Sequence, residues 1–325
     1  MGISRIFRAQ AQSYCQFLTG GEFMSTRLFG RIDSLQSTVL DPLVSLFAET
    51  EASPDQKLAI RLGLRSEYSG YAHKFNLVPR TSLAWKFSRK SQVSFSYGIF
   101  YQLPDQLTML YNPRGLSPEK AIHYIANYQY QQDDRTFRME LYYKRYDNLV
   151  TEYFPQQNYP GQAGYARGFE VFFRDRKSIP GLDAWISYSF TDSKRKTIVP
   201  GELVTPGYVS AHSISLVSKY WFSKAGMFVS ASYYYSGSRK YAFVRNSHST
   251  SFMPVPAYSS LDLSISKPVR LFSKPAMFFF SLQNVWGTDK LLGYTKIPAF
   301  AEPLRIYRSE KRTLFFGIFI SMYNN

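Results

Sequence analysis

Apolar and polar residues alternate with a period of two over most of this chain. In the segment SQVSFSYGIFYQ (residues 91–102), every second residue from Val93 to Tyr101 is apolar or aromatic, and most of the others are small or polar. Successive side chains of a β-strand point to opposite faces, so this pattern predicts a strand with one apolar face. Such a face fits the core of a soluble sheet protein and the lipid-facing side of a transmembrane barrel equally well.

About fourteen segments of this kind follow one another, which predicts an all-β antiparallel fold. The predicted strands span residues 13–26, 43–53, 57–69, 77–88, 91–103, 121–132, 135–151, 165–177, 182–194, 212–223, 226–238, 258–271, 275–288 and 312–323.

The connections between the predicted strands alternate in length. Connections of two to four residues, such as Arg89-Lys90 and Asp133-Asp134, alternate with mostly long ones such as 195–211 and 239–257, and the seven-residue connection 70–76 is an exception. Barrels of the outer membrane have tight periplasmic turns and long extracellular loops, whereas a soluble sandwich has no reason to keep this order. With fourteen strands, both ends of the chain are expected on the periplasmic side.

Charged residues of the predicted strands gather on one face. Arg61 and Arg65 alternate with Leu62 and Leu64, and Glu140 is followed by Leu141. A charge facing lipid at the middle of a membrane costs roughly 2–4 kcal/mol, whereas a polar lumen tolerates it. The pattern therefore predicts that the apolar residues face lipid and the charged residues face the lumen.

The composition favours the membrane alternative. The 325 residues include 26 Tyr and 27 Phe, and tyrosine suits a membrane interface because its ring enters lipid while its hydroxyl stays in water. No apolar run approaches the roughly 18 residues of a membrane helix, but a spanning strand needs only about 9–11 residues. Cys15 is the single cysteine, which excludes an intramolecular disulfide and a cysteine-based metal site. We therefore predict an antiparallel transmembrane β-barrel in the outer membrane.

The net charge of +16 raises the alternative of a nucleic-acid-binding protein. Lysine and arginine are scattered singly, however, and no nucleic-acid-binding motif is present, so we expect no nucleic-acid partner. The four histidines lack metal-ligand spacing, and the sequence has neither a nucleophile elbow nor a phosphate loop. We expect no enzymatic activity, no catalytic or metal-binding residue and no cofactor.

Several stretches resemble, in order, the barrel of TonB-dependent outer-membrane receptors of the type abundant in Bacteroidetes. Examples are LFAETEASPDQKLAIRLGLRSEYS (46–69), NLVPRTSLAWKF (76–87) and SLQNVWGTDKLLGY (281–294). The resemblance runs from about residue 20 to residue 325. Within it, LSPEKAIHYIANYQY (116–130) resembles a loop helix that leads into a strand. Ser117, Pro118 and Glu119 suit the start of that helix.

The resemblance implies a barrel of about 22 strands with a folded plug in its lumen. It also implies uptake of a scarce nutrient, such as an iron chelate, a vitamin or a glycan, driven through the plug by the TonB complex. Residues 1–17 do not form an export signal, and the sequence contains neither a TonB-contacting segment nor a plug. We expect residues 1–325 to be a partial barrel domain, lacking the signal, the plug and about eight first strands, and unable to transport alone.

The implied partners are the plug, the TonB complex, outer-membrane lipid, lipopolysaccharide and a substrate-binding surface lipoprotein. Two other functions stay open: a passive channel of fourteen strands, porin-like or for hydrophobic solutes, and a soluble β-rich binding protein. Conductance by the purified chain would favour the first, and solubility without detergent would favour the second.

Two sets of candidate site residues follow from these predictions. Aromatic and basic residues in the long loops suit stacking on sugars or binding of anionic groups, although contact with lipopolysaccharide phosphate or plain solvation explains them more simply. The loop candidates are Tyr111, Arg114, Arg239, Tyr241, Arg245, Tyr294, Arg305 and Tyr307. The candidates that face the lumen and its plug are Arg61, Arg65, Arg80, Glu140 and Glu170.

Overall fold

The computed structural model describes residues 2–12, 14–32, 35–112, 115–152, 158–196, 202–246, 249–295 and 303–321. One antiparallel sheet contains sixteen strands, fifteen of them in a continuous order from β1 to β20, and this confirms the all-β antiparallel prediction. The strands of that order are β1 (Gly2–Gln12), β2 (Cys15–Ile32), β3 (Leu35–Ala52), β4 (Leu58–Ser69), β5 (Lys74–Trp85), β6 (Ser91–Gln102), β7 (Glu119–Gln132), β8 (Arg135–Glu152), β9 (Asn158–Asp175), β10 (Leu182–Lys196), β12 (His212–Phe222), β13 (Met227–Ser236), β16 (Tyr258–Leu271), β17 (Lys274–Gln283) and β20 (Thr313–Ile320).

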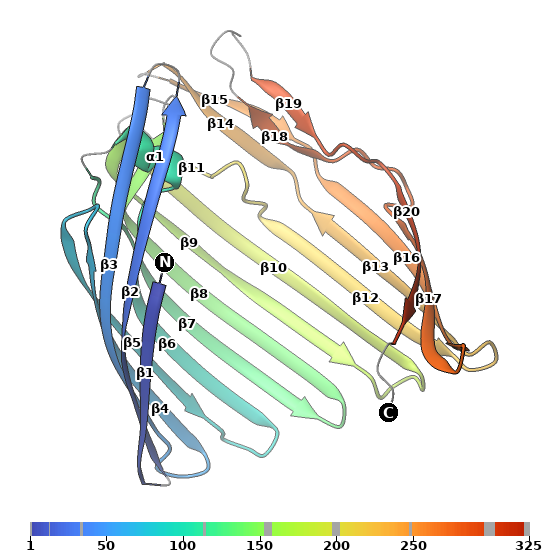
Figure 1. The fold of residues 1–325 in the computed structure, drawn as a ribbon. Coiled ribbons are helices and arrows are strands. Elements are labelled where there is room, and N and C mark those ends of the chain that lie inside the picture. Colours follow the sequence, from blue (N-terminus) through green and yellow to red (C-terminus); the bar gives the residue numbers. More distant parts are fainter. Residues whose placement is uncertain are drawn as a thin grey trace.

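The sheet forms a curved wall, with β1 at one edge and β20 at the other (Figure 1). Each strand pairs with its neighbour in the sequence, apart from short strands inserted in three connections, as in an up-and-down barrel. In the described part of the chain, no pairing joins β1 to β20.

The alternation of short and long connections is confirmed only in part. Residues 197–211, 237–257 and 284–312 form long connections, but the connection predicted at 152–164 shortens to residues 153–157, because β8 and β9 pair as far as Glu152, opposite Asn158. Strands β7 and β8 are joined by Asp133 and Asp134 alone, and both have positive φ. The long connections contain structure of their own: the strand β11 (Leu203–Val204), the hairpin β14 (Arg239–Asn246)–β15 (Ser249–Val255) and the hairpin β18 (Leu291–Thr295)–β19 (Leu304–Tyr307).

The first strand of the sheet was not among the predicted strands. β1 pairs along β2 from Gly2, opposite Met24, to Gln12, opposite Cys15. Its sequence mixes polar and apolar residues on both faces, so periodicity does not reveal it, and pairing with the β2 backbone decides its conformation. With fifteen strands in the order, Gly2 lies at the opposite end of β1 from the turn that leads into β2. The expectation that both chain ends fall on the periplasmic side was therefore wrong.

The second and third strands are longer than predicted. β2 and β3 stay in register to Ile32, opposite Leu35, so most of the predicted connection 27–42 is paired strand. The polar residues that suggested a connection alternate with apolar ones along this hairpin. Val39, for example, is 2% exposed.

The short helix lies elsewhere than predicted. α1 (Gln106–Tyr111) begins after Asp105, whose carboxylate accepts hydrogen bonds from the backbone N–H groups of Leu107 and Thr108. The predicted helix start at Ser117–Glu119 is wrong, because Glu119 is already the first residue of β7. The residue that caps the helix is therefore an aspartate next to Pro104, and Ser117 and Pro118 lie outside any helix, directly before β7.

The small apolar core lies under α1. Val39, Tyr71 and Met109 form a buried cluster, and Leu28 packs against it. Beside this cluster, Asp41 is 5% exposed and accepts hydrogen bonds from Ser69 Oγ (2.8 Å) and the Tyr71 backbone N–H (3.0 Å). Burial raises the pKa of Tyr71, and the Asp41 carboxylate adds to this. These contacts hold α1 against β2 and β3, on the concave side of the sheet (Figure 1).

The two faces of the sheet differ in chemistry as the sequence predicts. In β6, Phe95 lies on the convex face and is 58% exposed, and its partners across the strands are Leu83 and Ala126. The opposite face carries Gly98 and Phe100 of β6 together with charged residues of the neighbouring strands. A convex face of exposed apolar side chains is unfavourable in water and is typical of a surface that contacts lipid. Among the described residues, no helix has the length and hydropathy to cross a membrane.

Candidate functional site

A network of ion pairs covers the concave face of β2, β3 and β4. Arg65 Nη2 lies 2.7 Å from Glu22 Oε2, and Arg65 Nε lies 2.6 Å from Glu67 Oε1. This arginine therefore connects β4 to β2 across the intervening strand β3. Two of its five N–H donors are used by carboxylates, and its side chain is 21% exposed.

The second predicted arginine of β4 lies one step further along the same face. Arg61 contacts Glu49 at 3.3 Å and Glu51 at 2.5 Å, and both acids belong to β3. Arg80 of β5 lies in the same depression as Arg61, and its guanidinium carbon is 4.8 Å from the centre of the Phe100 ring. The structure thus brings Arg61, Arg65 and Arg80 together on one charged surface.

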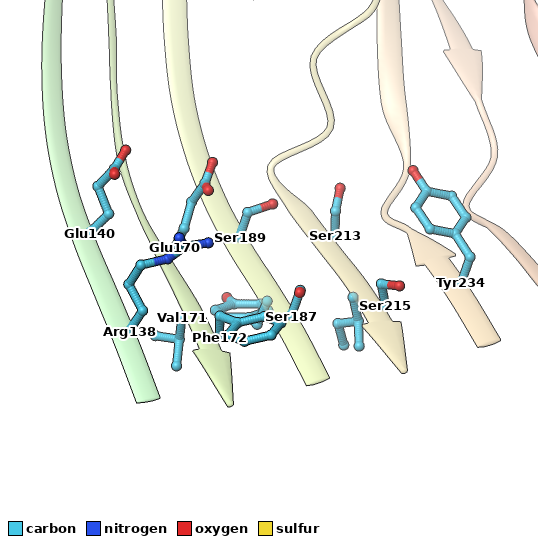
Figure 2. Close-up of a pocket in the computed structure, with 12 residues that line it drawn as sticks. Arg138, Glu140, Glu170, Val171, Phe172, Ser187, Ser189, Ser213, Ser215 and Tyr234 are labelled. Atoms are coloured by element: carbon cyan, nitrogen blue, oxygen red, sulfur yellow. The ribbon is translucent and has the colours of Figure 1, made fainter. Parts of the chain in front are cut away.

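The remaining predicted lumen residues lie on β8 and β9. Glu140 and Glu170 are directly opposite each other in the strand register. They line a depression of about 350 Å³ together with Arg138, whose guanidinium lies over the Phe172 ring at 5.6 Å. Figure 2 shows the two carboxylates pointing to the same side of the sheet as a row of serines. The serines of this depression are Ser187, Ser189, Ser213 and Ser215.

One site at the upper end of the concave face was not among the predicted residues. The guanidinium carbon of Arg195 lies 5.4 Å from the centre of the Tyr146 ring and 5.7 Å from the centre of the Tyr208 ring. The pairing of β8, β9 and β10 brings Tyr146 to Arg195, and Tyr208 reaches it from the connection that follows β11.

Three of the predicted loop residues meet where the two outer hairpins touch. Arg239 donates hydrogen bonds to the carbonyl oxygens of Gly207 (3.2 Å), Leu291 (3.4 Å) and Leu292 (3.0 Å). The Tyr241 and Tyr294 rings lie 5.5 Å apart. The Tyr294 hydroxyl donates to the carbonyl oxygen of Pro254 (2.7 Å). Much of the hydrogen-bonding capacity of Arg239 and Tyr294 is therefore used to join the β14–β15 hairpin to the β18–β19 hairpin.

The other loop candidates are more dispersed. Arg305 pairs with Tyr294 in the register of β18 and β19, and a hydrogen bond with exposed Tyr307 raises the pKa of Arg305. Tyr111 ends α1, which packs on β2 and β3 at the far end of the strand order. Arg114 and the side chain of Arg245 lie outside the described residues.

Neither the concave face nor the outer hairpins resemble a metal centre. Within the described ranges, no group of three or more His, Cys, Asp or Glu side chains is placed to hold a metal ion. The arrangement can bind by charge, by hydrogen bonding and by aromatic stacking, and its charged part lies on the concave wall.

The amino-acid sequence of this sheet matches a known protein family. The family profile described as "TonB dependent receptor-like, beta-barrel" matches residues 9–285. The chain belongs to this family of TonB-dependent receptor barrels. Its members are transport proteins of the outer membrane, so the family prediction made from the ordered stretches is confirmed.

Solved structures of such receptors share the fold. The FrpB iron transporter from Neisseria meningitidis superposes with a TM-score of 0.74 at 11% identity, over 98% of this chain and 54% of that protein. The ferric yersiniabactin uptake receptor FyuA from Yersinia pestis gives 0.73 at 11% identity, over 99% and 54%. The ferripyoverdine receptor of Pseudomonas aeruginosa gives 0.71 at 13% identity, over 98% and 48%.

The chain spans about half the length of these structural relatives. At such low identity, the superposition shows a common fold and leaves the substrate open. Among curated protein sequences, none matches this chain.

Proposed function

We propose that this chain forms part of the barrel wall of an outer-membrane receptor that takes up a scarce nutrient by energy-dependent transport. The proposal rests on the difference in side-chain polarity between the two faces of the sheet, in a chain that belongs to the TonB-dependent receptor family. The convex face is apolar and exposed, as lipid contact requires, while the ion pairs of Arg61 and Arg65 lie on the concave face.

The charged concave face is suited to hold a folded plug domain. Salt bridges of Arg61 and Arg65 hold polar groups in place, and the carboxylates of Glu140 and Glu170, which form no ion pair with the residues that the structure describes, offer acceptors for a basic partner. A plug held by such polar contacts can be rearranged by a pull from the TonB complex at a lower cost than one packed in an apolar core.

The outer hairpins are the proposed site of first contact with the nutrient. Tyr307 and Arg305 are exposed at this rim, and Tyr241 and Tyr294 supply stacked rings nearby. Aromatic rings with a guanidinium suit chelates, vitamins or glycans that combine planar groups with negative charge or hydroxyls. A surface lipoprotein that delivers such a nutrient would bind the same rim.

The proposal is tested by uptake in cells that produce the gene product from its own locus and in a deletion strain. Radiolabelled iron chelates, cobalamin and oligosaccharides are supplied with and without an uncoupler of the proton gradient. We expect one of these probes to enter only when the gene is present, and to be excluded when the gradient is collapsed. Recovery of the protein in the soluble fraction, or gene-dependent uptake that survives the uncoupler, would contradict the proposal.

The strand order counts against the passive-channel alternative. A closed channel made by this chain alone requires its first and last strands to pair, because an open sheet edge in lipid leaves backbone groups without partners. The described strands run from β1 to β20 without such a pair, and their number in the order is fifteen.

A further inference from the structure

Small residues line the concave side of β9 near its outer end, the end at which β10 enters the long connection 197–211. Gly164, Ala166 and Gly168 alternate along this side and form a trough between the longer side chains of β8 and β10. Above Gly168, the Tyr142 hydroxyl lies 2.7 Å from Thr191 Oγ1. A Cβ atom at Gly168 would lie 2.7 Å from that hydroxyl, so the missing side chain lets β8 and β10 meet over β9.

Arg195 and Tyr146 meet over the other end of this trough. Both are opposite Gly164, Arg195 on β10 and Tyr146 on β8. The Arg195 guanidinium carbon lies 5.4 Å from the centre of the Tyr146 ring and 5.7 Å from the centre of the Tyr208 ring, and both distances are within the range of a cation–π contact. A Cβ atom at Gly164 would lie 3.1 Å from Arg195 Cγ, so a larger residue here would crowd the arginine side chain.

Tyr208 is held beside Arg195 by the outer hairpin β14–β15. Arg239, the first residue of β14, donates a hydrogen bond to the carbonyl oxygen of Gly207 (3.2 Å), which directly precedes Tyr208. Tyr208 itself is 66% exposed. A residue of the rim therefore forms one side of the site, and this side remains open to solvent.

The guanidinium of Arg195 has an unsatisfied donor in the described part of the chain. Its Nε atom is buried and has no hydrogen-bond partner there, whereas Arg61 and Arg65 of the same face each contact two carboxylates. Glu202, which precedes β11, accepts a hydrogen bond from Thr250 Oγ1 (2.6 Å). A buried charged donor that lacks an acceptor is costly, and an anion bound at the same guanidinium would offset that cost.

The electrostatic surroundings of Arg195 favour an anion. The concave positions of β8, β9 and β10 along the trough contain two basic residues, Arg195 and Lys144, and no acidic one. Glu140 lies further down β8, and Asp192 faces the convex side, where it pairs with Arg167. The trough is therefore a local positive region at the outer end of the wall. Its concave positions are Tyr142, Lys144, Tyr146, Gly164, Ala166, Gly168, Thr191, Ser193 and Arg195.

We propose that Arg195, with Tyr146 and Tyr208, binds a carboxylate group of the transported nutrient. This rests on the proposed function and narrows its substrate class to molecules that carry a carboxylate, as against uncharged glycans. Because Nε is buried, the two terminal amino groups of Arg195 are the donors left for the two oxygens of a carboxylate. Two rings crowd the guanidinium, so a planar carboxylate fits its edge better than a tetrahedral phosphate.

The test uses the full gene product, purified in neutral detergent, and para-fluorobenzoate as the probe, with binding followed by fluorine NMR and empty micelles as the blank. Para-fluorobenzamide is the uncharged probe of the same shape. The parent should bind the carboxylate about tenfold more tightly than the amide, as one hydrogen-bonded charge pair implies. Arg195→Gln should weaken binding of the carboxylate about tenfold and leave binding of the amide unchanged.

Arg138→Gln is the matched control on the same concave face. Arg138 also lies over an aromatic ring, that of Phe172 (5.6 Å), but it shares its depression with Glu140 and Glu170. This variant should bind para-fluorobenzoate as the parent does. A loss of binding equal to that of Arg195→Gln would show a general effect of positive charge and would overturn the assignment.

Two further variants separate the roles of charge, fork geometry and ring. Arg195→Lys keeps the charge and loses the fork, so its affinity for the carboxylate should fall between those of the parent and Arg195→Gln. Tyr208→Ala removes a ring and should weaken binding of the carboxylate and the amide by the same factor. Equal binding of the two probes by the parent, unchanged binding by Arg195→Gln, or tighter binding of para-fluorophenyl phosphate than of para-fluorobenzoate would each contradict the carboxylate site.

The failure of this site and the failure of the proposed function are distinguishable. Heat-modifiable migration on a gel reports whether each variant is folded as a barrel, independently of binding. Carboxylate binding by the purified protein without energy-dependent uptake in cells would contradict only the transport function. Energy-dependent uptake by a protein that binds both probes equally would contradict only the role of Arg195.

Discussion

Glu140 of β8 and Glu170 of β9 face each other directly across the concave surface. No described cation lies within ion-pair distance of either carboxylate, although Arg138 shares the depression. Like charges directly opposite in a sheet are destabilising. A wall that keeps such a pair is suited to a basic group from a partner, which is what a plug in the lumen would supply.

Replacing Glu170 by Gln removes the repulsion and keeps the size of the side chain. We expect the free energy of unfolding of the chain without a partner to rise by about 0.5 kcal/mol, the usual scale of a cross-strand pair. The measurement is urea unfolding in phospholipid vesicles, followed by tryptophan fluorescence. The control is Glu51→Gln, which breaks the pair with Arg61 (2.5 Å) and should lower stability. A loss of stability in Glu170→Gln would show that the charge is already compensated.

Adjacent residues of β8 give a direct test of which face meets lipid. Leu141 lies on the convex face and is 49% exposed, and Glu140 lies on the concave face. Leu141→Arg should destabilise the folded barrel by roughly 2–4 kcal/mol, because the guanidinium is placed in the apolar band. Glu140→Arg introduces the same side chain one position away and should fold as well as the parent. Yields of the heat-modifiable form in the outer membrane measure both, and similar losses in the two variants would refute the assignment of faces.

Arg239 is expected mainly to stabilise the contact between the two outer hairpins. Arg239→Ala removes the hydrogen bonds to Gly207, Leu291 and Leu292, and each unsatisfied carbonyl of this partly exposed site costs up to about 1 kcal/mol. The variant should be cut faster by protease within 197–211 and 284–312, with the barrel core unchanged. Arg239→Lys has one ammonium group for three carbonyls and should give an intermediate cutting rate. Unchanged proteolysis combined with lost nutrient uptake would instead indicate that Arg239 contacts the nutrient.

The stability of the turn between β7 and β8 is expected to depend on pH. Lys177 Nζ donates to Asp133 Oδ2 (2.8 Å), which lowers the pKa of this carboxyl, and Gln132 adds a second hydrogen bond. A carboxyl with a lowered pKa in the folded state stabilises the fold above its ordinary pKa near 4, and this contribution is lost as the pH falls. Asp133→Asn should therefore be less stable than the parent at pH 7 and equally stable at about pH 2.

Asparagine tolerates the positive φ of 46° at this position, so the substitution changes the charge and leaves the turn geometry intact. Lys177→Gln should give the same pH pattern, since it removes the other half of the pair. A stability difference that is the same at both pH values would mean that the ion pair makes no contribution.

The alternation of side chains determined the class of fold and the chemistry of its two faces. Leu62 and Leu64 against Arg61 and Arg65 required a strand with one lipid-like and one polar side, because the side-chain period of a strand is two. The lengths of the connections then gave the up-and-down order. The alternation of side chains and the lengths of the connections are properties of short stretches of sequence, and they do not depend on which strands pair.

Tertiary structure decided the elements that lack a local signal. β1 has no clean alternation and exists as a strand because β2 offers it a row of backbone partners. The helix forms after Asp105, where Met109 finds an apolar cluster from β3 and the turn after β4, and the Ser-Pro pair further on has no such cluster. The meeting of Arg195 with Tyr146, and of Glu140 with Glu170, depends on strand register. A shift of the pairing by one residue would turn these side chains to the opposite face. The periodicity of the sequence therefore determines which residues of a strand share a face, and only the pairing of strands determines which residues of neighbouring strands lie side by side.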